Sequence, residues 1–484
     1  MKKYSLIIIA LLFGYQILFS QTQIGNSILG TDLFKRAGRS VALSADGTLL
    51  AIGAHESNTQ SSGIVRVYQR IESNWFQVGN DITGTSNGDN FGCSLSLSSD
   101  GSIIAIGAHG SGSNGYVRVY QNATNSNQWV QLGNDIVSTT DFNYFGSSVS
   151  LSSNGSVLAI SAERDSSSGF INRGKVKVFK NINSSWLQIG NDLNGEATSD
   201  YFGTSISLSS DGILLAVGAP GNDYNGTDSG TVTIYQYSNG NWITFGNTIG
   251  GEATGDISGQ SVSLSADGTT IAIGAPNNDN ANGSNAGQVR VYKKIGATWT
   301  IIGTEINGET QNIKLGYDVS LSASGEILAI GTPFGANSAG RVKFYINNSN
   351  FWIPLGNAID GDEMGDFSSD ALCIAADGST VSIGSTNHGS YFGQVKVFDL
   401  SQLLSLSNNT LFGFTIYPNP TKNSFSINSK IPIKIVTLYD LLGKKIKMFD
   451  AYQTTFDISE FNAGIYLLEI QTNQGKTASL IIKE

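Results

Sequence analysis

The stretch LSADGTLLAIGA, from Leu43 to Ala54, decides the fold because it recurs along the chain. Five further copies begin at Leu97, Leu151, Leu208, Leu264 and Leu321, and a weaker one, IAADGSTVSIGS, begins at Ile374. Successive copies start 53 to 57 residues apart. A nearly constant period of this length indicates a repeat architecture.

Each repeat reads as four short strands. An alternating run leads into Asp-Gly or Asn-Gly, a pair that permits a tight two-residue hairpin. The second strand follows this turn, and the third has the form Gly-x-Val-x-Val-Tyr, as in 115–120. The fourth begins at a Trp, and all six tryptophans of the chain occupy this position: Trp75, Trp129, Trp186, Trp242, Trp299 and Trp352. Seven units of four antiparallel strands predict an all-β fold, a seven-bladed β-propeller.

The two ends of the repeat region indicate how the ring closes. The seventh unit ends after its third strand, 394–398, and has no Trp-led fourth strand. Residues 23–28, QIGNSI, match the fourth-strand sequence QVGNDI at 77–82. We therefore expect the N-terminal segment to complete the last blade, which leaves no open sheet edge. The predicted propeller spans residues 21–400.

Composition and charge restrict the function classes. Charged residues make up only 14% of the chain and Gly numbers 58, which is typical of short strands and tight turns. The net charge is −10, although the tail from Thr415 has eight Lys against six acidic residues, so the acidity lies in the body. An acidic body argues against nucleic acid as a partner. Cys93 and Cys373 lie in different registers of their repeats and are expected to be buried thiols.

Residues 1–20 predict a secretory signal peptide. Lys2 and Lys3 precede an apolar run from Leu6 to Phe19, and Ser20 is a small residue at the expected cleavage point. An uncleaved membrane anchor is the alternative, but the run is short for a span. We expect no membrane span after cleavage, and a monomer.

The repeat resembles the FG-GAP repeat of integrin α-subunit propellers. Phe91-Gly92, Phe145-Gly146 and Phe202-Gly203 correspond to the FG, and 218–220 and 274–276 to the GAP. The resemblance covers residues 23 to about 399 and implies the propeller fold. In the calcium-binding repeats of that family, alternate carboxylates wrap the ion. Here the run in blade four offers one carboxylate, Asp211, so we expect no metal and no cofactor.

The chain end resembles the C-terminal sorting domain of the type IX secretion system of Bacteroidetes. The residues that carry the resemblance are Tyr417, Pro418, Asn419, Pro420, Gly443, Lys444, Gly464, Tyr466 and Lys483. The pattern predicts a linker at 401–413 and a small C-terminal β-sandwich (Ig-like) domain at 414–484. The resemblance implies a partner, the type IX secretion machinery, and a secreted or outer cell-surface location. An ordinary adhesive module is the alternative.

The candidate binding residues lie in two classes of long loop. Loops between the second and third strands, and between the fourth strand and the next blade, should leave the propeller on one face, which we name the long-loop face. Its candidate ligand-binding residues are Glu196, Asp200, Asp223, Asn225, Asp228, Glu252, Asp256, Asp279 and Asn280. Turn formation and solubility explain the same composition equally well.

Catalytic motifs are scarce. The chain has three histidines, and His55, His109 and Glu163 occupy the same position of successive repeats. Equivalent positions on neighbouring blades should lie roughly 10 Å apart, the spacing of facing sheets, which is too far for shared metal ligation. No nucleophilic triad can be assembled, although two carboxylates from different blades could act as a glycosidase pair without leaving a motif.

We therefore predict a secreted, non-enzymatic binding or adhesion protein that recognises a surface glycan or protein through its long-loop face. The alternatives are an exported polysaccharide- or peptide-processing enzyme and a structural surface-layer component.

Overall fold

The computed structural model describes residues 21–484 except 32–34, 56–60, 111–114, 124–127, 139–142, 349, 408–413, 430–431, 441–443, 451–452, 454 and 473–474. The predicted signal peptide and Gly443 therefore lie outside the described residues. The chain divides into two compact units, one ending at Leu400 and one beginning at Ser401. The second unit opens with helix α3 (Ser401–Ser407), in the region predicted as a linker.

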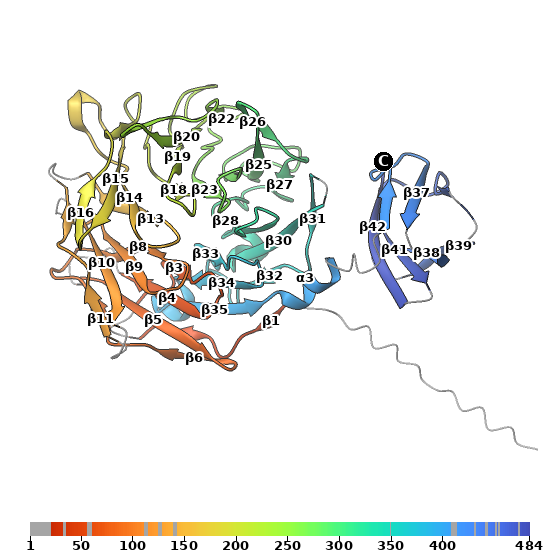
Figure 1. Ribbon diagram of the computed structural model, residues 1–484, viewed down its shortest axis with the longest axis horizontal. Helices are drawn as coiled ribbons and strands as arrows, with labels where there is room; N and C mark the ends of the chain where they lie inside the picture. The colour runs from red at the N-terminus through yellow and green to blue at the C-terminus, as the bar shows by residue number, and fades with distance from the viewer. Residues whose placement is uncertain are drawn as a thin grey trace, which may run out of the picture. The chain divides into compact units, whose positions relative to one another are not determined.

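The first unit consists of seven antiparallel sheets around a common centre (Figure 1). The first strands of the blades are β3 (Ser40–Leu43), β8 (Phe91–Leu97), β13 (Phe145–Leu151), β18 (Ile206–Leu208), β23 (Ser261–Leu264), β28 (Val319–Leu321) and β33 (Ala371–Ile374). The second strands are β4 (Leu49–Ala54), β9 (Ile103–Ala108), β14 (Val157–Ala162), β19 (Leu214–Ala219), β24 (Thr270–Ala275), β29 (Ile327–Thr332) and β34 (Thr380–Ser385). The third strands are β5 (Ile64–Ile71), β10 (Tyr116–Ala123), β15 (Lys175–Ile182), β20 (Thr231–Ser238), β25 (Gln288–Ile295), β30 (Arg341–Asn348) and β35 (Gln394–Asp399).

The fourth strands are β6 (Asn74–Gln77), β11 (Gln128–Gln131), β16 (Ser185–Gln188), β21 (Asn241–Thr244), β26 (Thr298–Ile301), β31 (Phe351–Pro354) and β1 (Thr22–Gln23). A two-residue fifth strand pairs with each third strand: β7 (Ile82–Thr83), β12 (Ile136–Val137), β17 (Leu193–Asn194), β22 (Ile249–Gly250), β27 (Ile306–Asn307), β32 (Ile359–Asp360) and β2 (Ile28–Leu29). Helical turns are short: η1 (Ser167–Gly169), α1 (Gly335–Ser338) and α2 (His388–Tyr391). The seven sheets confirm the predicted seven-bladed propeller.

The first strands form the inner ring. Each contacts the first strand of the next blade, and β33 contacts β3. At the Asp-Gly turns, a closed circle of seven backbone hydrogen bonds of 2.8–3.0 Å links each blade to the next, through Ala45, Ser99, Ser153, Ser210, Ala266, Ala323 and Ala376. The last of these, from Ala376 N–H to the Ala45 carbonyl, joins blade seven to blade one, so the ring is closed by the backbone itself.

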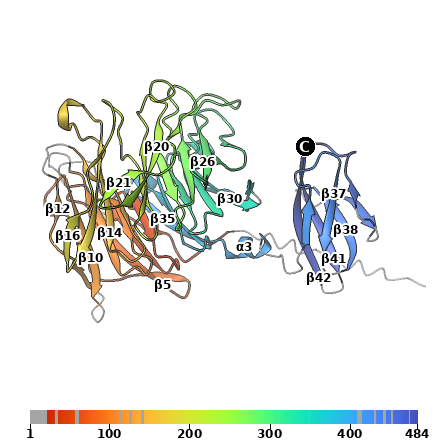
Figure 2. The same ribbon diagram turned by 45° about the horizontal axis from the view of Figure 1, so that its top comes forward.

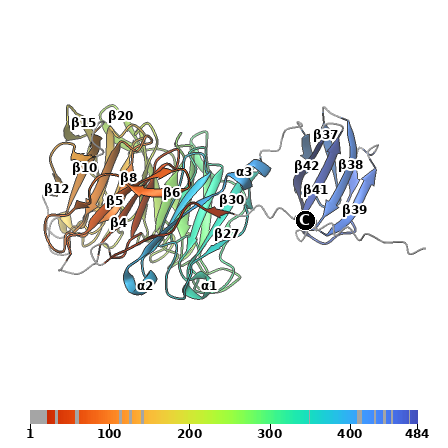
Figure 3. The same ribbon diagram turned by 90° about the horizontal axis from the view of Figure 1, so that it is seen from below.

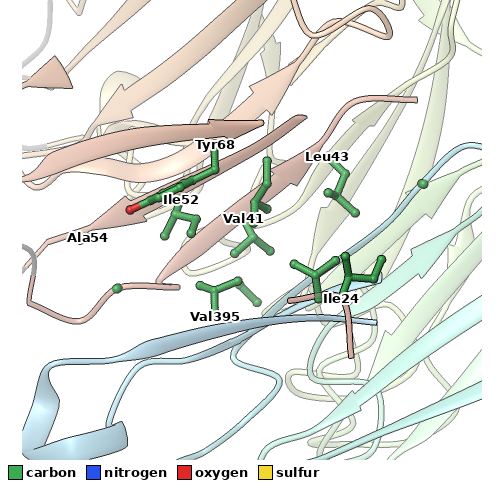
Figure 4. Packing of buried hydrophobic residues seen from close by; sticks show 12 residues of the cluster. Ile24, Val41, Leu43, Ile52, Ala54, Tyr68 and Val395 are labelled. Carbon is green, nitrogen blue, oxygen red and sulfur yellow. The ribbon is translucent and has the colours of Figure 1, made fainter. Parts of the chain in front are cut away.

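The N-terminal segment completes blade seven, as predicted. Thr22 and Gln23 pair with Asp399 and Phe398, so β1 lies against β35, and Ile28–Leu29 pair with the start of the same strand (Figure 1). Between them, Ile24 is 8% exposed and packs in a cluster with side chains of blades one and seven (Figure 4). The first residues of the propeller therefore hold its last blade to its first.

The tryptophans link neighbouring blades at the outer strands. Five indole N–H groups donate to a carbonyl of the preceding blade at 2.9–3.3 Å, on Ile24, Val78, Leu132, Ile189 and Phe245. The sixth, on Trp352, has no partner. Gln21 stands at the corresponding place in blade seven, and its side-chain amide donates to the Asn357 carbonyl of blade six. The repeated Trp is thus an inter-blade donor.

The backbone of the next blade approaches the residue that precedes each third strand so closely that this residue must be Gly. Gly63 has a φ of +87°, and a Cβ there would lie 2.1 Å from the Phe91 carbonyl oxygen of the next blade. At Gly230 the φ is +80°, and the corresponding distance, to Ser258, is also 2.1 Å. Only Gly permits both this backbone conformation and this contact.

The Asp-Gly turns use their carboxylates internally. Asp46 Oδ1 accepts from Ser44 Oγ at 2.6 Å and from the Thr48 N–H at 3.0 Å. Asp100 and Asp267 make the same two contacts within their own turns. In blade three, Asn154 replaces the Asp and still accepts from Ser152 Oγ at 2.9 Å. These side chains act as turn-stabilising acceptors.

These turns predict acid sensitivity. Burial acts to raise the pKa of Asp46, Asp100 and Asp267, but hydrogen bonds from Ser hydroxyls and backbone N–H groups outweigh it and lower each pKa. A carboxyl with a lowered folded pKa stabilises the fold above its unfolded value of about 3.9, and loses this effect as the pH falls through the folded value. We therefore expect the free energy of unfolding to decrease below about pH 4.

Urea unfolding between pH 7 and pH 3 measures this effect. Replacing the three aspartates by Asn retains the Oδ1 acceptor and should flatten the acid part of the pH profile. The converse variant Asn154→Asp should steepen it. Identical pH profiles for the wild type, the triple Asn variant and Asn154→Asp would contradict the stabilising role of these carboxylates.

The second unit contains a β-sandwich (Figure 2). One sheet has the order β36 (Phe414–Tyr417), β37 (Ser424–Ser429), β40 (Phe456–Asp457), and the other β39 (Lys445–Asp450), β38 (Ile433–Tyr439), β41 (Gly464–Thr472), β42 (Gly475–Lys483). Phe425 and Phe456 from the first sheet stack at 5.1 Å between ring centroids, and Phe449 from the second meets Phe456 edge-on at 5.4 Å. This aromatic core confirms the predicted small C-terminal β domain.

Candidate functional site: the long-loop face

The two classes of long loop do meet on one face. The segment that leads into each first strand forms backbone hydrogen bonds with the preceding blade, at the loop between that blade's second and third strands. Phe202 N–H donates to the Arg173 carbonyl at 3.0 Å, Ser368 to Ala339 at 2.9 Å, and Ala37 to the Phe392 carbonyl at 3.0 Å. Helical turns α1 and α2 both belong to these loops and lie on one side of the propeller (Figure 3).

Seven residues, one at the same repeat position of each blade, have a left-handed backbone conformation and form a ring on this face. Their φ angles are +49° to +58°, and they are Arg36, Asn90, Tyr144, Tyr201, Ile257, Lys314 and Phe367. Such angles are uncommon outside Gly, and for a β-branched residue such as Ile257 they are strained. Backbone hydrogen bonds hold the conformation, as between Tyr201 N–H and the Asn172 carbonyl at 3.0 Å. The ring therefore presents large side chains at fixed positions.

Two of the predicted binding residues are buried. Asp200 is 2% exposed and accepts from the Glu196 and Ala197 N–H groups at 2.7 and 2.8 Å. Asp256 is 3% exposed and accepts in the same way from Glu252 and Ala253. Both carboxylates shape the loop that contains them and do not face solvent.

The two glutamates remain at the surface. Glu196 and Glu252 are exposed, and each directly follows a Gly, Gly195 or Gly251, at the same position of its repeat. Glu252 lies 3.1 Å from Gln288 Nε2 and 3.6 Å from the Arg290 guanidinium, both in β25. Its charge is therefore partly neutralised by the next blade.

The remaining predicted residues lie in the loops of blades four and five and mostly bind their own loop. Asp223 and Asp228 are exposed, and Asp223 Oδ1 accepts from the Asp228 N–H at 2.9 Å. The side chain of Asn225 donates to the Gly251 carbonyl at 2.6 Å. Asp279 accepts from the Asn285 N–H at 2.7 Å, and Asn280 donates to Gly287 at 3.1 Å. The structure places all nine residues on the long-loop face, where most of their polar atoms form turns.

An aromatic patch on blades six and seven was not predicted. We define it as Phe334, Met364, Phe367 and Tyr391. The Phe334 and Phe367 rings are 5.2 Å apart, and the Lys314 Nζ lies 5.4 Å from the Phe334 ring. Met364 is 81% and Tyr391 52% exposed. The Lys314 ammonium therefore lies within the range of a cation–π interaction with Phe334.

An axial cluster lies at the ends of the first two blades, and the sequence had pointed only to its two histidines. We define it as Arg39, His55, Asn90 and His109. The His55 and His109 rings lie 6.1 Å apart, edge to face, and His109 stacks on Tyr144 at 4.8 Å. The expected separation of roughly 10 Å was wrong, because blades converge towards the axis and the mean spacing of facing sheets does not apply there.

The two histidines of this cluster have lowered pKa values. Burial lowers the pKa of His55 to about 3 and that of His109 to about 4, and the nearby charge of Arg39 acts in the same direction. Within the described ranges, no three or more His, Cys, Asp and Glu side chains have the arrangement of a metal site. The repeat position of Arg36 and Arg39, directly before the first strand, is the sequence signal that could have identified them.

The sorting-motif residues connect the start of the C-terminal domain to its last strand, β42, through hydrogen bonds and strand pairing. Asn419 donates from Nδ2 to the Leu480 carbonyl and accepts on Oδ1 from the Ile482 N–H, both at 2.8 Å. Gly464 pairs with Lys483, which is 9% exposed, and Lys444 N–H donates to Asp440 at 2.8 Å.

Of the two tyrosines of the motif, Tyr417 lies at the surface, whereas Tyr466 is half-buried and packs against the core of the sandwich. Tyr417 is 57% exposed and precedes Pro418 and Pro420, which flank Asn419. Tyr466 donates its hydroxyl to the Asn462 carbonyl at 2.7 Å. The motif residues therefore serve both the fold of the tail and its exposed surface.

Fold and motifs together define a repeat β-propeller that carries an export tail. Residues 194–235 and 250–292 match the family described as FG-GAP repeat, and residues 415–484 match the secretion system C-terminal sorting domain family. The chain thus contains FG-GAP repeats within a seven-bladed propeller, and a type IX sorting domain at 415–484. No curated protein matches the chain. A solved structure titled "Structure of U3-55K" is similar with 11% identity and a TM-score of 0.48, over 78% of this chain and 98% of that one.

The sorting domain indicates export by type IX secretion to the cell surface or the extracellular space, and it implies interaction with the secretion machinery. In the described part of the chain, no helix has the length and apolar character needed to cross a bilayer.

Proposed function

We propose that this secreted propeller is a non-enzymatic binding or adhesion protein whose ligand, a surface glycan or a protein, docks on the long-loop face. One observation carries the proposal. The long loops of blades three, four, six and seven expose large apolar side chains, 37–81% exposed: Phe170, Ile171, Tyr224, Phe334, Met364 and Tyr391. Exposed aromatic and Met side chains on rigid loops are typical of interaction surfaces.

A processing enzyme is the second candidate, and one pair of carboxylates favours it. Asp318 in blade six and Asp370 in blade seven face the same blade interface, and burial raises the pKa of Asp318 to about 7. Both carboxylates, however, bind the chain itself: Asp318 accepts from the Leu372 N–H at 2.8 Å and Asp370 from the Thr386 hydroxyl. These hydrogen bonds support a structural role for both carboxylates, so we prefer a binding function to an enzymatic one.

A binding screen tests the proposal. The protein from Gln21 onward is applied to immobilised glycans and extracellular-matrix proteins, and each hit is measured with a face variant, Phe334→Ala/Met364→Ala/Tyr391→Ala. We expect the face variant to bind more than about tenfold more weakly, because truncation of a central interface side chain costs about 1 kcal/mol or more.

The matched control is a rim variant, Phe76→Ala/Val130→Ala/Leu187→Ala. These side chains are 51–57% exposed, but they lie on the outer strands. The rim variant should bind within about twofold of wild type. Equal losses in both variants, or hydrolysis of a screened glycan that Asp318→Asn abolishes, would overturn the proposal.

A further inference from the structure

A buried carboxylate recurs in the segments that lead into the first strands of blades two, five and seven. Asp89, Asp256 and Asp366 are 3–5% exposed, and each accepts backbone N–H groups of its own segment, as Asp366 does from Glu363 at 3.0 Å. A carboxylate has more acceptor sites than these N–H groups occupy, so a buried one requires further donors. In all three blades a side chain in or beside the loop between the second and third strands supplies one.

Blades five and seven supply this donor from the same repeat position but with different side chains. In blade five, the side-chain amide of Asn278 donates to Asp256 Oδ2 at 3.2 Å. In blade seven, Nδ1 of His388 lies 2.9 Å from Asp366 Oδ2. Asn278 and His388 each follow the last residue of the second strand by three positions. Because a carboxylate only accepts hydrogen bonds, the His388 Nδ1 carries the proton and donates it.

The blade-seven donor is the one whose charge changes near neutral pH. An amide does not titrate, and in blade two the donor to Asp89 is the Tyr116 hydroxyl at 2.7 Å, whose pKa is raised by burial. An imidazole ordinarily gains a proton between about pH 8 and pH 5, a range in which carboxylates keep their charge. The His388 contact then becomes a charge-assisted hydrogen bond, about twice as strong as a neutral one. Mild acid therefore strengthens this contact and leaves the corresponding contacts of blades two and five unchanged.

The other charged groups on the elements packed around His388 are close to balanced. They are Asp362, Glu363 and Asp370 from the segment that leads into β33, Lys396 from β35, and Lys35, Arg36 and Arg39 from the segment that leads into blade one. Asp362 and Lys396 form an ion pair with each other. Asp366 lies at hydrogen-bond distance from the imidazole, so its attraction outweighs the effect of the more distant charges.

The contact connects the two segments that carry most of the aromatic patch. Met364 and Phe367 lie within two residues of Asp366, and Tyr391 ends helical turn α2, which begins at His388. The φ angles of Phe367 and Tyr391 are +50° and +72°, which cost energy in residues other than Gly. Hydrogen bonds must therefore hold both residues in place. The His388–Asp366 contact thus determines how firmly these two segments are held together.

We propose that the His388–Asp366 contact is a pH-dependent clasp, in which protonation of the imidazole tightens the contact, fixes the aromatic patch and strengthens binding at the long-loop face. The clasp weakens as the pH rises from about 5.5 to about 8, because the imidazole then loses its charge. Only the effect on binding rests on the proposed function. The clasp itself is a property of the protein without a ligand.

Hydrogen exchange of the protein from Gln21 onward tests the clasp without a ligand. Backbone exchange in 361–369 and 386–393 is measured at pH 5.5 and at pH 8, and the rates are corrected for the intrinsic effect of pH. We expect these segments to open about three- to tenfold less often at pH 5.5, since a charge-assisted hydrogen bond is about twice as strong as a neutral one. The corresponding segment of blade five, 251–259, should show no such difference.

Two variants exchange the donors of the two blades. His388→Asn places the blade-five side chain in blade seven, so it keeps a donor but should abolish the pH dependence of 361–369. Asn278→His makes the reverse exchange and should introduce a pH dependence into 251–259. Opening that is independent of pH in wild type, or that retains its pH dependence in His388→Asn, would overturn the clasp.

A dye titration tests the effect on binding. Nile red is neutral in this pH range and binds exposed apolar surface, and its binding to the patch is the part lost in the face variant. We expect this part to be about three- to tenfold tighter at pH 5.5 than at pH 8 in wild type, because a patch that is already ordered loses less entropy on binding. In His388→Asn the two affinities should be equal.

The outcomes separate this inference from the proposed function. If Nile red binds wild type and the face variant alike, or binds the patch equally at both pH values, the effect of the clasp on binding is overturned. A glycan or matrix protein that requires the patch but binds equally at both pH values would leave the proposed function intact and overturn its regulation. Ligands that are indifferent to the patch would overturn the proposed function, whereas the exchange result would still decide the clasp.

Discussion

Replacing Ile24 by Ala lowers the free energy of unfolding of the propeller by about 2–5 kcal/mol, the usual cost of truncating a buried Ile. Ile24 is 8% exposed and lies between blades one and seven. Its N–H donates to the Val397 carbonyl at 2.7 Å, and its carbonyl accepts from the Trp75 indole at 3.1 Å. A weakened β1–β35 contact leaves blade seven with an open edge, so we place the effect in the upper half of that range.

Tryptophan fluorescence during urea unfolding measures this loss. All six tryptophans lie in the propeller, so the signal does not report on the tail. Leu29→Ala is the matched control: it belongs to the same N-terminal segment, but Leu29 is 55% exposed. It should change the stability by no more than about 0.5 kcal/mol. Equal effects of the two substitutions would show that the N-terminal segment does not lock the ring.

Deleting residues 414–484 abolishes export. These residues lie in a separate compact unit and have their own aromatic core, and 415–484 match the sorting domain family. Because the signal that the secretion machinery recognises lies in this unit, the truncated protein should accumulate in the periplasm. Fractionation and immunoblotting of cells and medium measure the distribution. Unchanged delivery to the surface or the medium would refute the assignment.

A point substitution refines the same prediction. Asn419→Ala removes both hydrogen bonds to β42 and should destabilise the tail by about 1–3 kcal/mol, because the Ile482 N–H and the Leu480 carbonyl lose their partner. Lys422→Ala, an exposed neighbour, is the control. We expect reduced export for Asn419→Ala and normal export for Lys422→Ala. The reverse order would mean that the recognised feature is surface charge and not the fold of the tail.

Most of the fold could be predicted because its determinants are local. The Asp-Gly pairs specify tight turns, and each Trp marks a fourth strand, so strand order follows from the sequence alone. The match of 23–28 to 77–82 predicted the closure of the ring for the same reason, since one repeated pattern has one structural role.

The candidate site was predicted only in part. Loop composition placed the nine residues on one face, but it could not separate buried acceptors such as Asp200 and Asp256 from exposed groups. It also gave no weight to Phe334 or Tyr391, because a single exposed aromatic residue has no pattern in a sequence.

The sequence by itself determined the seven repeats, their strand order, the N-terminal closure and the sorting tail, since periodic hydrophobicity and turn residues act between near neighbours in the chain. Only the tertiary structure decided which polar side chains meet. Arg39, His55, His109 and Tyr144 come together because seven blades converge on one axis, and there residues a whole repeat apart become neighbours. That convergence depends on long-range closure, which no local pattern encodes.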